Sequence, residues 1–435
     1  MTIVNKGAAL PSELTLDDQV PTSLLELQRD GDGEEMSLKH FQRIWVPGPL
    51  IIGAGPSGLA TAACLKEKGI PSLILEKENC IASSWRLRTY EHLKMHLPKH
   101  LCGLPLMRFP PEFPVYPTKQ QFISYLDSYA KHFSVSPLFG MEVGHAEYNK
   151  NIGFWRILSN NWEFMTKWLI IATGENAEAI VPEINGMSKF QGRVLHTSCY
   201  RKGDDFRGER VLVVGCGNSG MEVSLDLSNN YAEPSMVVRD KLHILPREVL
   251  GISTFALSLR LMKCLPVKIV DRILLLCSWL ILGETEKYGL KRPKVGPLQL
   301  KNITGKTPVL DIGTLSRIKS GKIKVVTGIN RFMAKGVEFL DGRQEQFDSV
   351  IFATGYKSTV PSWLKEDFFC KREGFPKTAI PKTWKGENGV YAIGFSRRGL
   401  LGASIDANRI AEDIANQWNS NTNQLPQQLQ SKNHM

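Results

Sequence analysis

Two glycine-rich segments have the spacing that binds the phosphates of a dinucleotide. Gly53-Ala54-Gly55-Pro56-Ser57-Gly58 follows the apolar residues 50–52, and Gly215-Cys216-Gly217-Asn218-Ser219-Gly220 follows the apolar residues 211–214. In this GxGxxG pattern the first glycine allows a sharp turn, the second lets a pyrophosphate approach the backbone, and the third lets a helix pack on its strand. The N–H groups that begin the helix then face the phosphates. We therefore predict two dinucleotide sites in one chain.

The residue that ends the next strand distinguishes the two sites. Glu76 ends a strand predicted over 72–76, at the offset where a carboxylate can bind a ribose hydroxyl. Arg239 stands at the equivalent place after residues 235–238. An arginine can bind a 2′-phosphate through a charge-assisted fork, whereas a carboxylate would repel it. We predict FAD at the first site and NADPH at the second.

Other side chains could reach a bound flavin or its substrate. Trp85 ends the small-residue loop 80–85, and it either lies against the flavin or anchors the core. Arg397 and Arg398 either pair with a substrate carboxylate or the flavin pyrophosphate, or they lie in solvent. The sequence leaves both sets of alternatives open.

The pattern of apolar segments predicts the elements that would carry these residues. Helices are expected near 59–68 and 221–227, and an apolar strand that ends in Ala-Thr-Gly occurs twice, at 167–174 and 349–355. Such strands are typical of the buried centre of a parallel sheet. We predict an α/β fold with two Rossmann-like dinucleotide-binding domains. Because the second Ala-Thr-Gly strand follows the second glycine turn, we expect the NADPH domain to be inserted into a discontinuous FAD domain.

Domain boundaries follow from the same segments. The residues before the first strand are acidic and polar without clear periodicity, apart from a short helix predicted at 24–27, and the last residues are rich in Gln and Asn. The predicted order is a disordered extension at 1–46, the first part of the FAD-binding domain at 47–205, the NADPH-binding domain at 206–345, the second part of the FAD-binding domain at 346–418, and a disordered tail at 419–435.

Composition limits the class of protein. The chain has 435 residues, of which 42% are hydrophobic and 22% charged, which suits a soluble globular enzyme of two or three domains. The net charge of +11 is not concentrated in a Lys/Arg run, so nucleic acid is not an expected partner. The eight cysteines contain no CxxC pair, so we expect neither a metal site nor a redox-active dithiol.

Neither secretion nor a membrane span is expected. The N-terminus lacks an apolar h-region. The most apolar run, at 273–282, is shorter than the ~20 residues that a membrane span requires, so a buried or pocket-lining helix is favoured over a membrane-surface segment. We expect a cytoplasmic protein and leave peripheral association with the endoplasmic reticulum (ER) membrane open.

A third motif lies between the two glycine turns. Phe190-Gln191-Gly192-Arg193-Val194-Leu195-His196-Thr197-Ser198-Cys199-Tyr200 fits the pattern FxGxxxHxxxY, and in this position it resembles the signature of the class B flavin-containing monooxygenases. A narrower similarity to the plant YUCCA subfamily extends over about residues 50–416. Cys199 departs from the acidic residue common at that place in the subfamily, at a position that the signature leaves free. The segments that carry the similarity are 172–178, 215–223, 288–293, 307–313 and 352–356.

The resemblance implies a reaction. It is the NADPH- and O2-dependent oxidative decarboxylation of indole-3-pyruvate, a small 2-oxo acid, to indole-3-acetic acid, the main auxin, through a flavin hydroperoxide. The resemblance also implies that His96 lies near the flavin edge, where many relatives have an asparagine, so His96 is the candidate catalytic residue; a structural histidine is the alternative. His196 is expected to order the linker between the domains. Two other functions stay open: a generic N- or S-oxygenating monooxygenase, and a flavoprotein that does not oxygenate.

Overall fold

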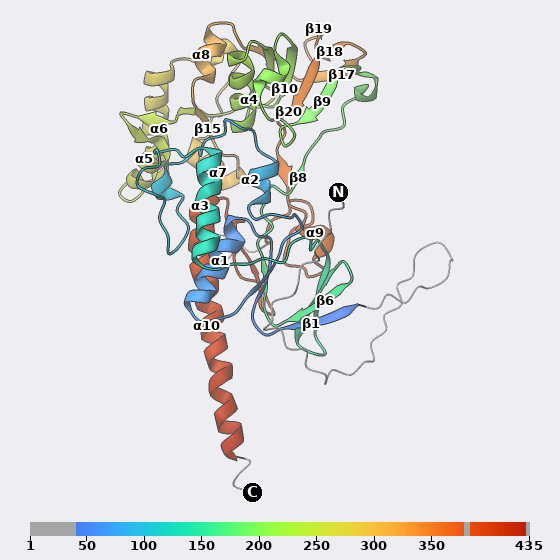
Figure 1. The fold of residues 1–435 in the computed structure, drawn as a ribbon. Coiled ribbons are helices and arrows are strands. Elements are labelled where there is room, and N and C mark those ends of the chain that lie inside the picture. Colours follow the sequence, from blue (N-terminus) through green and yellow to red (C-terminus); the bar gives the residue numbers. More distant parts are fainter. Residues whose placement is uncertain (1–40, 378–382, 432–435) are drawn as a thin grey trace, which may run out of the picture.

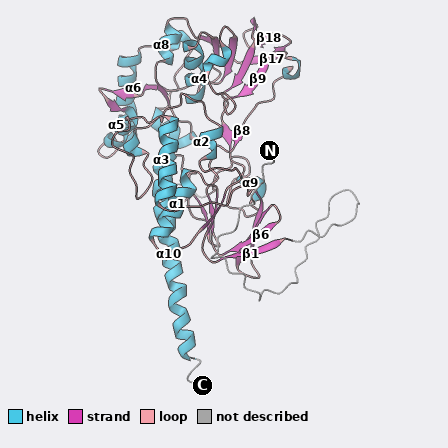
Figure 2. Cartoon of the chain, in the orientation of Figure 1, coloured by secondary structure: helices cyan, strands magenta, loops and turns pink. Residues whose placement is uncertain are grey.

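The computed structural model describes residues 41–377 and 383–431. Two predicted segments lie partly outside the described residues. They are residues 1–40 of the extension predicted at 1–46, with its short helix at 24–27, and residues 432–435 of the predicted tail. The chain forms two lobes, each built on a parallel sheet with helices against it (Figures 1 and 2). This arrangement agrees with the α/β fold expected from the sequence.

The first lobe is built on a four-stranded parallel sheet. Its order is β22 (Val390–Ala392), β7 (Leu169–Ile171), β2 (Leu50–Ile52) and β3 (Leu73–Leu75). In register, Ile51 of β2 faces Ile170 of β7 on one side and Ile74 of β3 on the other. All residues of β2 and β7 are buried, as is typical of parallel strands that are covered on both faces.

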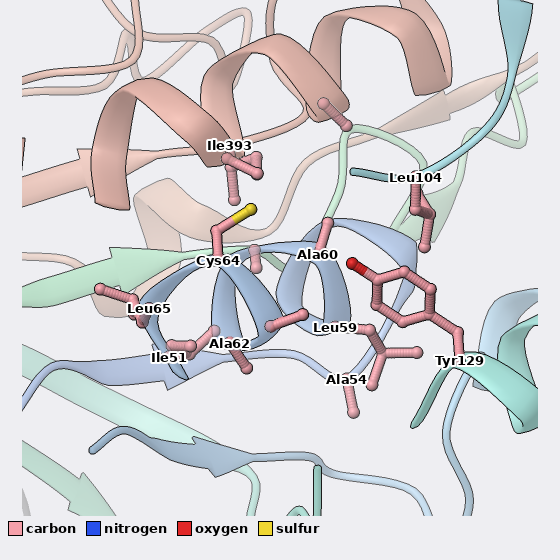
Figure 3. Close-up of a cluster of buried hydrophobic side chains, with 14 of the residues drawn as sticks. Ile51, Ala54, Leu59, Ala60, Ala62, Cys64, Leu65, Leu104, Tyr129 and Ile393 are labelled. Carbon is pink, nitrogen blue, oxygen red and sulfur yellow. The ribbon is translucent and has the colours of Figure 1, made fainter. Parts of the chain in front are cut away.

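The helix α1 (Pro56–Glu67) joins β2 to β3 and packs against α10 (Gly399–Ser431). It begins at Pro56, three residues before the predicted start, because proline's fixed φ suits the first helical position. Figure 3 shows α1 within a buried hydrophobic cluster of the first lobe. Tyr129 of α3 (Lys119–His132) lies beside the helix, and Ala60 and Cys64 are on the side that faces Ile393. Such small residues let α1 and α10 approach each other closely. This packing holds α1, and with it the glycine turn that precedes α1, against the core.

A mixed sheet covers the other side of the first lobe. Its order is β1 (Gln42–Val46), β6 (Trp162–Thr166), β5 (Phe154–Ser159) and β4 (Val143–Asn149), with β1 parallel to β6. The predicted boundary at residue 46 is therefore wrong, because β1 at 42–46 already belongs to the first lobe. Ile44 and Val46 point into the core while Trp45 is exposed, and five residues are too few for that alternation to stand out.

The second lobe is built on a five-stranded parallel sheet. Its order is β16 (Lys324–Val326), β11 (Glu233–Val237), β10 (Arg210–Val214), β20 (Ser349–Phe352) and β9 (Arg193–His196). Helix α4 (Asn218–Asn229) follows β10 as α1 follows β2. The predicted boundaries at 205 and 346 are therefore wrong, because β9 and β20 pair with each other and β20 pairs with β10. The two Ala-Thr-Gly strands occupy equivalent places in different lobes.

The chain crosses between the lobes at two places, and the two crossings pair with each other. After β7 it runs through β8 (Glu178–Ala179), and after β20 it returns through β21 (Tyr356–Lys357), antiparallel to β8. The second lobe is thus inserted into the first. After α9 (Val360–Trp363) and β22, the chain ends in α10, which is helical to Ser431, so the tail predicted from residue 419 is not irregular over that stretch.

Smaller elements complete the second lobe. An antiparallel sheet lies at one end and a group of helices at the other (Figure 1). Their bounds are β17 (Ile329–Met333), β18 (Gly336–Phe339), β19 (Gln344–Gln346), β12 (Ile244–Pro246), β13 (Glu248–Val249), β14 (Ile252–Ser253), β15 (Val309–Asp311), α5 (Thr254–Leu261), α6 (Val267–Leu282), α7 (Pro297–Thr304) and α8 (Thr314–Lys319).

Helix α6 contains the apolar run that the sequence analysis expected to be buried. One face is buried, through Val270, Leu274, Ser278 and Leu282. The opposite face is exposed, so the expectation is correct for only half of the helix: Leu276, Trp279, Leu280 and Ile281 are each at least 50% exposed. Among the described residues, no helix is both long and apolar enough to cross a membrane.

Candidate functional site

The three glycines of the first turn have different surroundings. Gly53 has φ +106°, and a Cβ there would lie 2.7 Å from the Ala172 carbonyl oxygen. A Cβ on Gly58 would overlap the carbonyl oxygen of Gly53. A Cβ on Gly55 would have no atom within 4 Å. Gly53 and Gly58 therefore shape the turn itself, whereas Gly55 faces open space that a ligand could enter.

A cavity of about 980 Å³ opens on this turn. Its size lies at the upper end of the range for small-molecule and cofactor sites. The walls come from the glycine turn, from the start of α10, from the loop that contains α2 (Ser83–Leu87), and from the residues after β7. Predicted site residues on these walls are Gly53, Gly55, Pro56, Ser57, Glu76 and Trp85.

Glu76 is almost wholly buried in the cavity wall, at 5% exposure. One carboxylate oxygen accepts a hydrogen bond from the backbone N–H of Ala54 at 2.8 Å. The other accepts from the N–H of Glu78 and from the hydroxyl of Ser83, both at 3.1 Å. An ionised carboxylate has about four acceptor positions, so one remains for a ribose hydroxyl. Ala54 thus contributes through its backbone, which holds Glu76 in place.

Trp85 packs on the core and also lies on the cavity wall. Its ring packs edge-on against Phe122 of α3, with centroids 4.4 Å apart, and it also lines the cavity. Thr173, from the first Ala-Thr-Gly, adds a polar group to the same wall: its hydroxyl is buried and makes no hydrogen bond within the described parts of the chain. A cavity with an apolar ring, a buried carboxylate and an orphan hydroxyl fits a ligand that is partly aromatic and partly polar, as a flavin dinucleotide is.

The second turn repeats the geometry of the first. Gly215 has φ +122°, and a Cβ there would lie 2.5 Å from the Ala353 carbonyl oxygen; a Cβ on Gly220 would overlap the Gly215 carbonyl oxygen. A Cβ on Gly217 would again meet nothing within 4 Å. The side-chain oxygen of Asn218 accepts from the N–H of Leu310 at 3.0 Å, which ties the turn to β15. The second turn therefore has the same open approach to its backbone.

Charged side chains surround this second turn. Burial raises the pKa of the Cys216 thiol to about 11, which keeps it protonated, and the charges of Asp240, Lys306 and Arg239 also act on it. Arg239 is 77% exposed at the end of β11, and its guanidinium lies 3.3 Å from the carboxylate of Asp240. Lys306 lies 3.5 Å from the same carboxylate. Two exposed cations beside the turn could bind a phosphate. Ser219, inside α4, follows Asn218 in this turn.

His96 lies at the contact between the lobes. Its Nε2 is 2.7 Å from Oε1 of Glu222, a buried residue of α4 that follows Gly220 by two positions. The hydroxyl of Tyr90, from the same first-lobe segment as His96, donates to the other oxygen of Glu222. One turn further along α4, Asp226 lies 3.3 Å from Nδ1 of His92. The segment that contains His96 is therefore bound to the helix of the second glycine turn.

The His96–Glu222 contact changes the acidity of both groups. Burial lowers the pKa of His96, but the hydrogen bond and negative charge of Glu222 raise it by more, so the net pKa is above its ordinary value. Burial raises the pKa of Glu222, but His96 and Tyr90 lower it by more, so the net pKa is below its ordinary value. The pair thus favours an imidazolium beside a carboxylate. This is the bonding of a structural ion pair, the alternative that the sequence analysis kept open for His96.

Sequence reasoning missed Glu222, Tyr90 and Asp226. Glu222 stands in the motif 215–223 that the analysis singled out, but only as part of a pattern. A carboxylate among the apolar residues of α4 was the signal that could have found it, because a buried charge requires a partner.

His196 lies where the chain crosses between the lobes. Its Nε2 is 3.1 Å from the Gly355 carbonyl oxygen, and its ring packs edge-on against Tyr356. Burial lowers its pKa, so the imidazole is neutral near pH 7. These contacts order the crossing and do not place His196 on the cavity wall. The described residues contain no group of three or more His, Cys, Asp or Glu side chains that could hold a metal ion.

The family model and two curated relatives that match this chain are all monooxygenases. The family model "Flavin-binding monooxygenase-like" matches residues 49–375. "Indole-3-pyruvate monooxygenase YUCCA6" of Arabidopsis thaliana is 58% identical, over 86% of this chain and 91% of that protein. "Indole-3-pyruvate monooxygenase YUCCA1" of Oryza sativa subsp. japonica is 55% identical, over 86% of this chain and 93% of that protein.

Solved structures with the same fold are more distant in sequence. The flavin-containing monooxygenase from Stenotrophomonas maltophilia is 20% identical, with a TM-score of 0.65 over 85% of this chain and 98% of that chain. Cyclohexanone monooxygenase from Rhodococcus sp. Phi1, bound to NADP+, is 18% identical, with a TM-score of 0.64 over 86% of this chain and 85% of that chain. This likeness confirms the predicted fold class.

The open space at Gly55 generates a first prediction. Gly55→Val should fold, since a Cβ at this position has no atom within 4 Å, but it should not retain FAD, because the valine would occupy the pyrophosphate position. Flavin absorbance of the purified protein and circular dichroism would measure the two effects. Gly58→Val is the contrasting variant: its side chain overlaps the Gly53 carbonyl, so the fold itself should be destabilised. A yellow, folded Gly55→Val protein would contradict the assignment.

The His96–Glu222 pair generates a second prediction. The raised pKa of His96 adds stability that is complete below its unfolded value of about 6.5 and is lost as pH rises through the folded value. The lowered pKa of Glu222 adds stability that is present above about 4.3 and is lost as pH falls. Glu222→Gln should therefore reduce the free energy of unfolding by about 1–2 kcal/mol at pH 6, and by less at pH 9. Urea denaturation at both pH values would measure this.

Glu233→Gln provides the control for that measurement, because Glu233 is exposed at the start of β11. Glu233→Gln should change the free energy of unfolding only slightly, and by the same amount at pH 6 and pH 9. An equal loss at pH 6 and pH 9 for Glu222→Gln would mean that the histidine charge contributes nothing.

Proposed function

The chain belongs to the flavin-binding monooxygenase-like family and to its YUCCA branch, and from this premise we propose that it converts indole-3-pyruvate to indole-3-acetic acid. The chain is an FAD-containing, NADPH-dependent monooxygenase. The observation that carries the substrate assignment is its identity of 58% and 55% to proteins with this activity in their names, over at least 86% of the chain. Similarity of this extent includes both glycine turns and the residues between them.

The proposed reaction consumes one NADPH, one proton and one O2 for each substrate. The bond between the carboxyl carbon and the keto carbon breaks and carbon dioxide leaves. One oxygen atom of O2 enters the new carboxylic acid, and the other leaves as water with the hydride of NADPH and the proton. When bound, the flavin supplies the electron transfer between NADPH and O2.

The FAD assignment uses the first glycine turn and its cavity. The backbone of residues 53–58 would approach the pyrophosphate, with the N-terminus of α1 behind it. Glu76 would accept a ribose hydroxyl at its remaining acceptor position. Trp85 would lie against the flavin portion of the ligand. The enclosed walls would keep water from the reacting groups.

The NADPH assignment uses the second turn. The backbone of residues 215–220 would approach the pyrophosphate, and Arg239 would bind the 2′-phosphate, with Lys306 as a second cation nearby. His96 is placed beside Glu222 of α4, so its proposed role is to position that helix relative to the flavin loop. A role for His96 in proton transfer has no support from this geometry.

The central prediction is NADPH-dependent turnover. FAD-loaded protein, NADPH and indole-3-pyruvate in air should yield indole-3-acetic acid, identified by mass, in a 1:1 ratio to NADPH consumed. NADPH should be preferred over NADH. Hydrogen peroxide as the only product would favour a flavoprotein that does not oxygenate, and faster turnover of a tertiary amine than of the keto acid would favour the generic oxygenase.

Arg239→Gln separates the coenzyme assignment from the reaction. It should raise the KM for NADPH about tenfold or more, because a charge-assisted hydrogen bond is lost, and leave NADH nearly unaffected. Arg343→Gln is the control, since Arg343 is exposed on the β18–β19 hairpin beside Asp341. Equal use of the two coenzymes by the unmodified protein would contradict the role of Arg239.

We also propose peripheral association with a membrane surface such as that of the ER, through α6. Its exposed row of Leu276, Trp279, Leu280 and Ile281 supports this, because a large apolar patch with cations around it suits an anionic bilayer surface. Helix α6 also carries the exposed cations Lys268 and Arg272, and Lys263 is exposed in the segment before it.

Vesicle binding tests the membrane proposal. The protein should float with vesicles that contain about one-fifth phosphatidylserine, and Leu280→Asp should reduce the bound fraction severalfold. Leu340→Asp is the matched control, since Leu340 is 65% exposed and Leu280 67%, on different parts of the lobe. Binding that is equally weak for both variants and for the unmodified protein would exclude the surface.

A further inference from the structure

Three cations, Lys301, Arg397 and Arg398, gather where the two lobes meet beside the flavin cavity. We propose that Lys301 and Arg397 bind the carboxylate of the 2-oxo acid substrate, with Arg398 adding to the positive potential. The inference deepens the proposed function and rests on it. It assigns the recognition of the substrate's acid group to one residue from each lobe.

The end of α7, the helix that carries Lys301, lies against Arg397. Gly305 follows this helix with φ +74°, and its N–H donates to the Lys301 carbonyl oxygen at 2.8 Å. A Cβ on Gly305 would overlap the guanidinium of Arg397, so that group packs directly on the backbone one turn from Lys301. The C-terminal end of a helix carries a partial negative charge that favours a cation there. Lys301 belongs to the second lobe and Arg397 to the first.

Lys301 has no anionic partner of its own. Its ammonium lies 5.5 Å from the centre of the Phe255 ring, and within residues 41–377 and 383–431 it makes no hydrogen bond or ion pair. Burial lowers its pKa, the charge of Arg398 lowers it further, and only Glu175 acts in the opposite direction. A half-buried ammonium without an acceptor is unfavourable unless an anion reaches it. This is the observation that points to a ligand.

Arg397 is held in a conformation that its residue type disfavours. Its φ is +57°, in the left-handed region that is unfavourable for a non-glycine residue. Its guanidinium stacks on the Phe375 ring at 4.3 Å and lies 3.7 Å from the exposed Glu373. Backbone strain of this kind persists where the surroundings fix it, often at ligand sites. Here it turns the guanidinium toward the end of α7.

Residues next to this cluster line the flavin cavity. Glu175 lines that cavity, directly after the first Ala-Thr-Gly. Burial raises the pKa of Glu175, whereas the charges of Arg397 and Lys301 act to lower it. Gly399 and Leu400, immediately after Arg398, also line the cavity. A ligand bound by the cations would therefore lie beside the space assigned to the flavin.

The surroundings favour the carboxylate of an aromatic acid over a phosphate. Phe255 and Phe375 lie beneath the two cations and offer apolar surface to an indole ring. The carboxylate of Glu175 would repel a doubly charged phosphate more than a singly charged acid. An arginine fork and an ammonium together match the two oxygens of one carboxylate. The phosphates of NADPH are the other anions that could reach the cluster, and the test separates them.

The test measures binding without turnover. Calorimetric titration of oxidised, FAD-loaded protein with indole-3-pyruvate, its neutral methyl ester and NADPH gives three dissociation constants. Lys301→Met and Arg397→Gln should each raise the Kd for the acid tenfold or more and change the Kd for the ester and for NADPH by less than twofold. Lys294→Met is the matched control, because Lys294 is exposed in the loop before α7, and it should change none of the three.

Several results would overturn the proposal. An unchanged Kd for the acid in both variants would do so, as would equal losses for acid and ester, or a loss for NADPH alone, which would make the cluster a phosphate site. If Arg397→Gln does not fold, Lys301→Met decides the outcome, since Lys301 is on a short helix of which only Pro297 is fully buried. Binding of the acid through these residues without formation of indole-3-acetic acid would support the binding site and contradict the proposed function.

Discussion

The constraint on which both lobes depend is the close contact between a helix and the strand before it. At Gly58 and at Gly220 there is no room for a single additional carbon atom, because the carbonyl oxygen of the first glycine of each turn occupies that position. Gly53 and Gly215 have positive φ and lie against the carbonyl oxygens of Ala172 and Ala353, which directly follow the neighbouring strands β7 and β20. The alanine in each Ala-Thr-Gly is therefore part of the same turn. This contact places the N–H groups of α1 and α4 where a pyrophosphate can bind.

The relative position of the two lobes depends on helix α4, which the second glycine turn holds in place. Because α4 is fixed against β10 by Gly220, its buried face presents Glu222 and Asp226 at a defined place. The first lobe binds that face through His96, Tyr90 and His92. Two buried or half-buried charges in one contact are unfavourable unless they meet in good geometry, so the contact selects one arrangement of the lobes. The contact of His96 with Glu222 is part of this arrangement.

Sequence alone predicted the parts of the fold that are local. The glycine turns and their strands follow from short-range steric rules, and the structure has them at nearly the expected residues. The sheet to which a strand belongs is not a local property. β20 has the same Ala-Thr-Gly ending as β7, and the sequence could not show that it pairs with β10 and β9. In the same way, His96 and Glu222 are 126 residues apart, and only the packed structure reveals their contact.

The inserted topology explains why residues for substrate recognition should come from both lobes. A reaction that needs two nucleotides has to take place where their reactive ends meet, which is between the lobe of β2 and the lobe of β10. Side chains at that junction belong to α7 in the second lobe and to the loop before α10 in the first. Neither segment carries a motif, because its residues act only when the other lobe is in place. Lys301 and Arg397 fit this description. Gly305, at the end of α7, has no side chain, and the guanidinium of Arg397 fills the space that a side chain there would need.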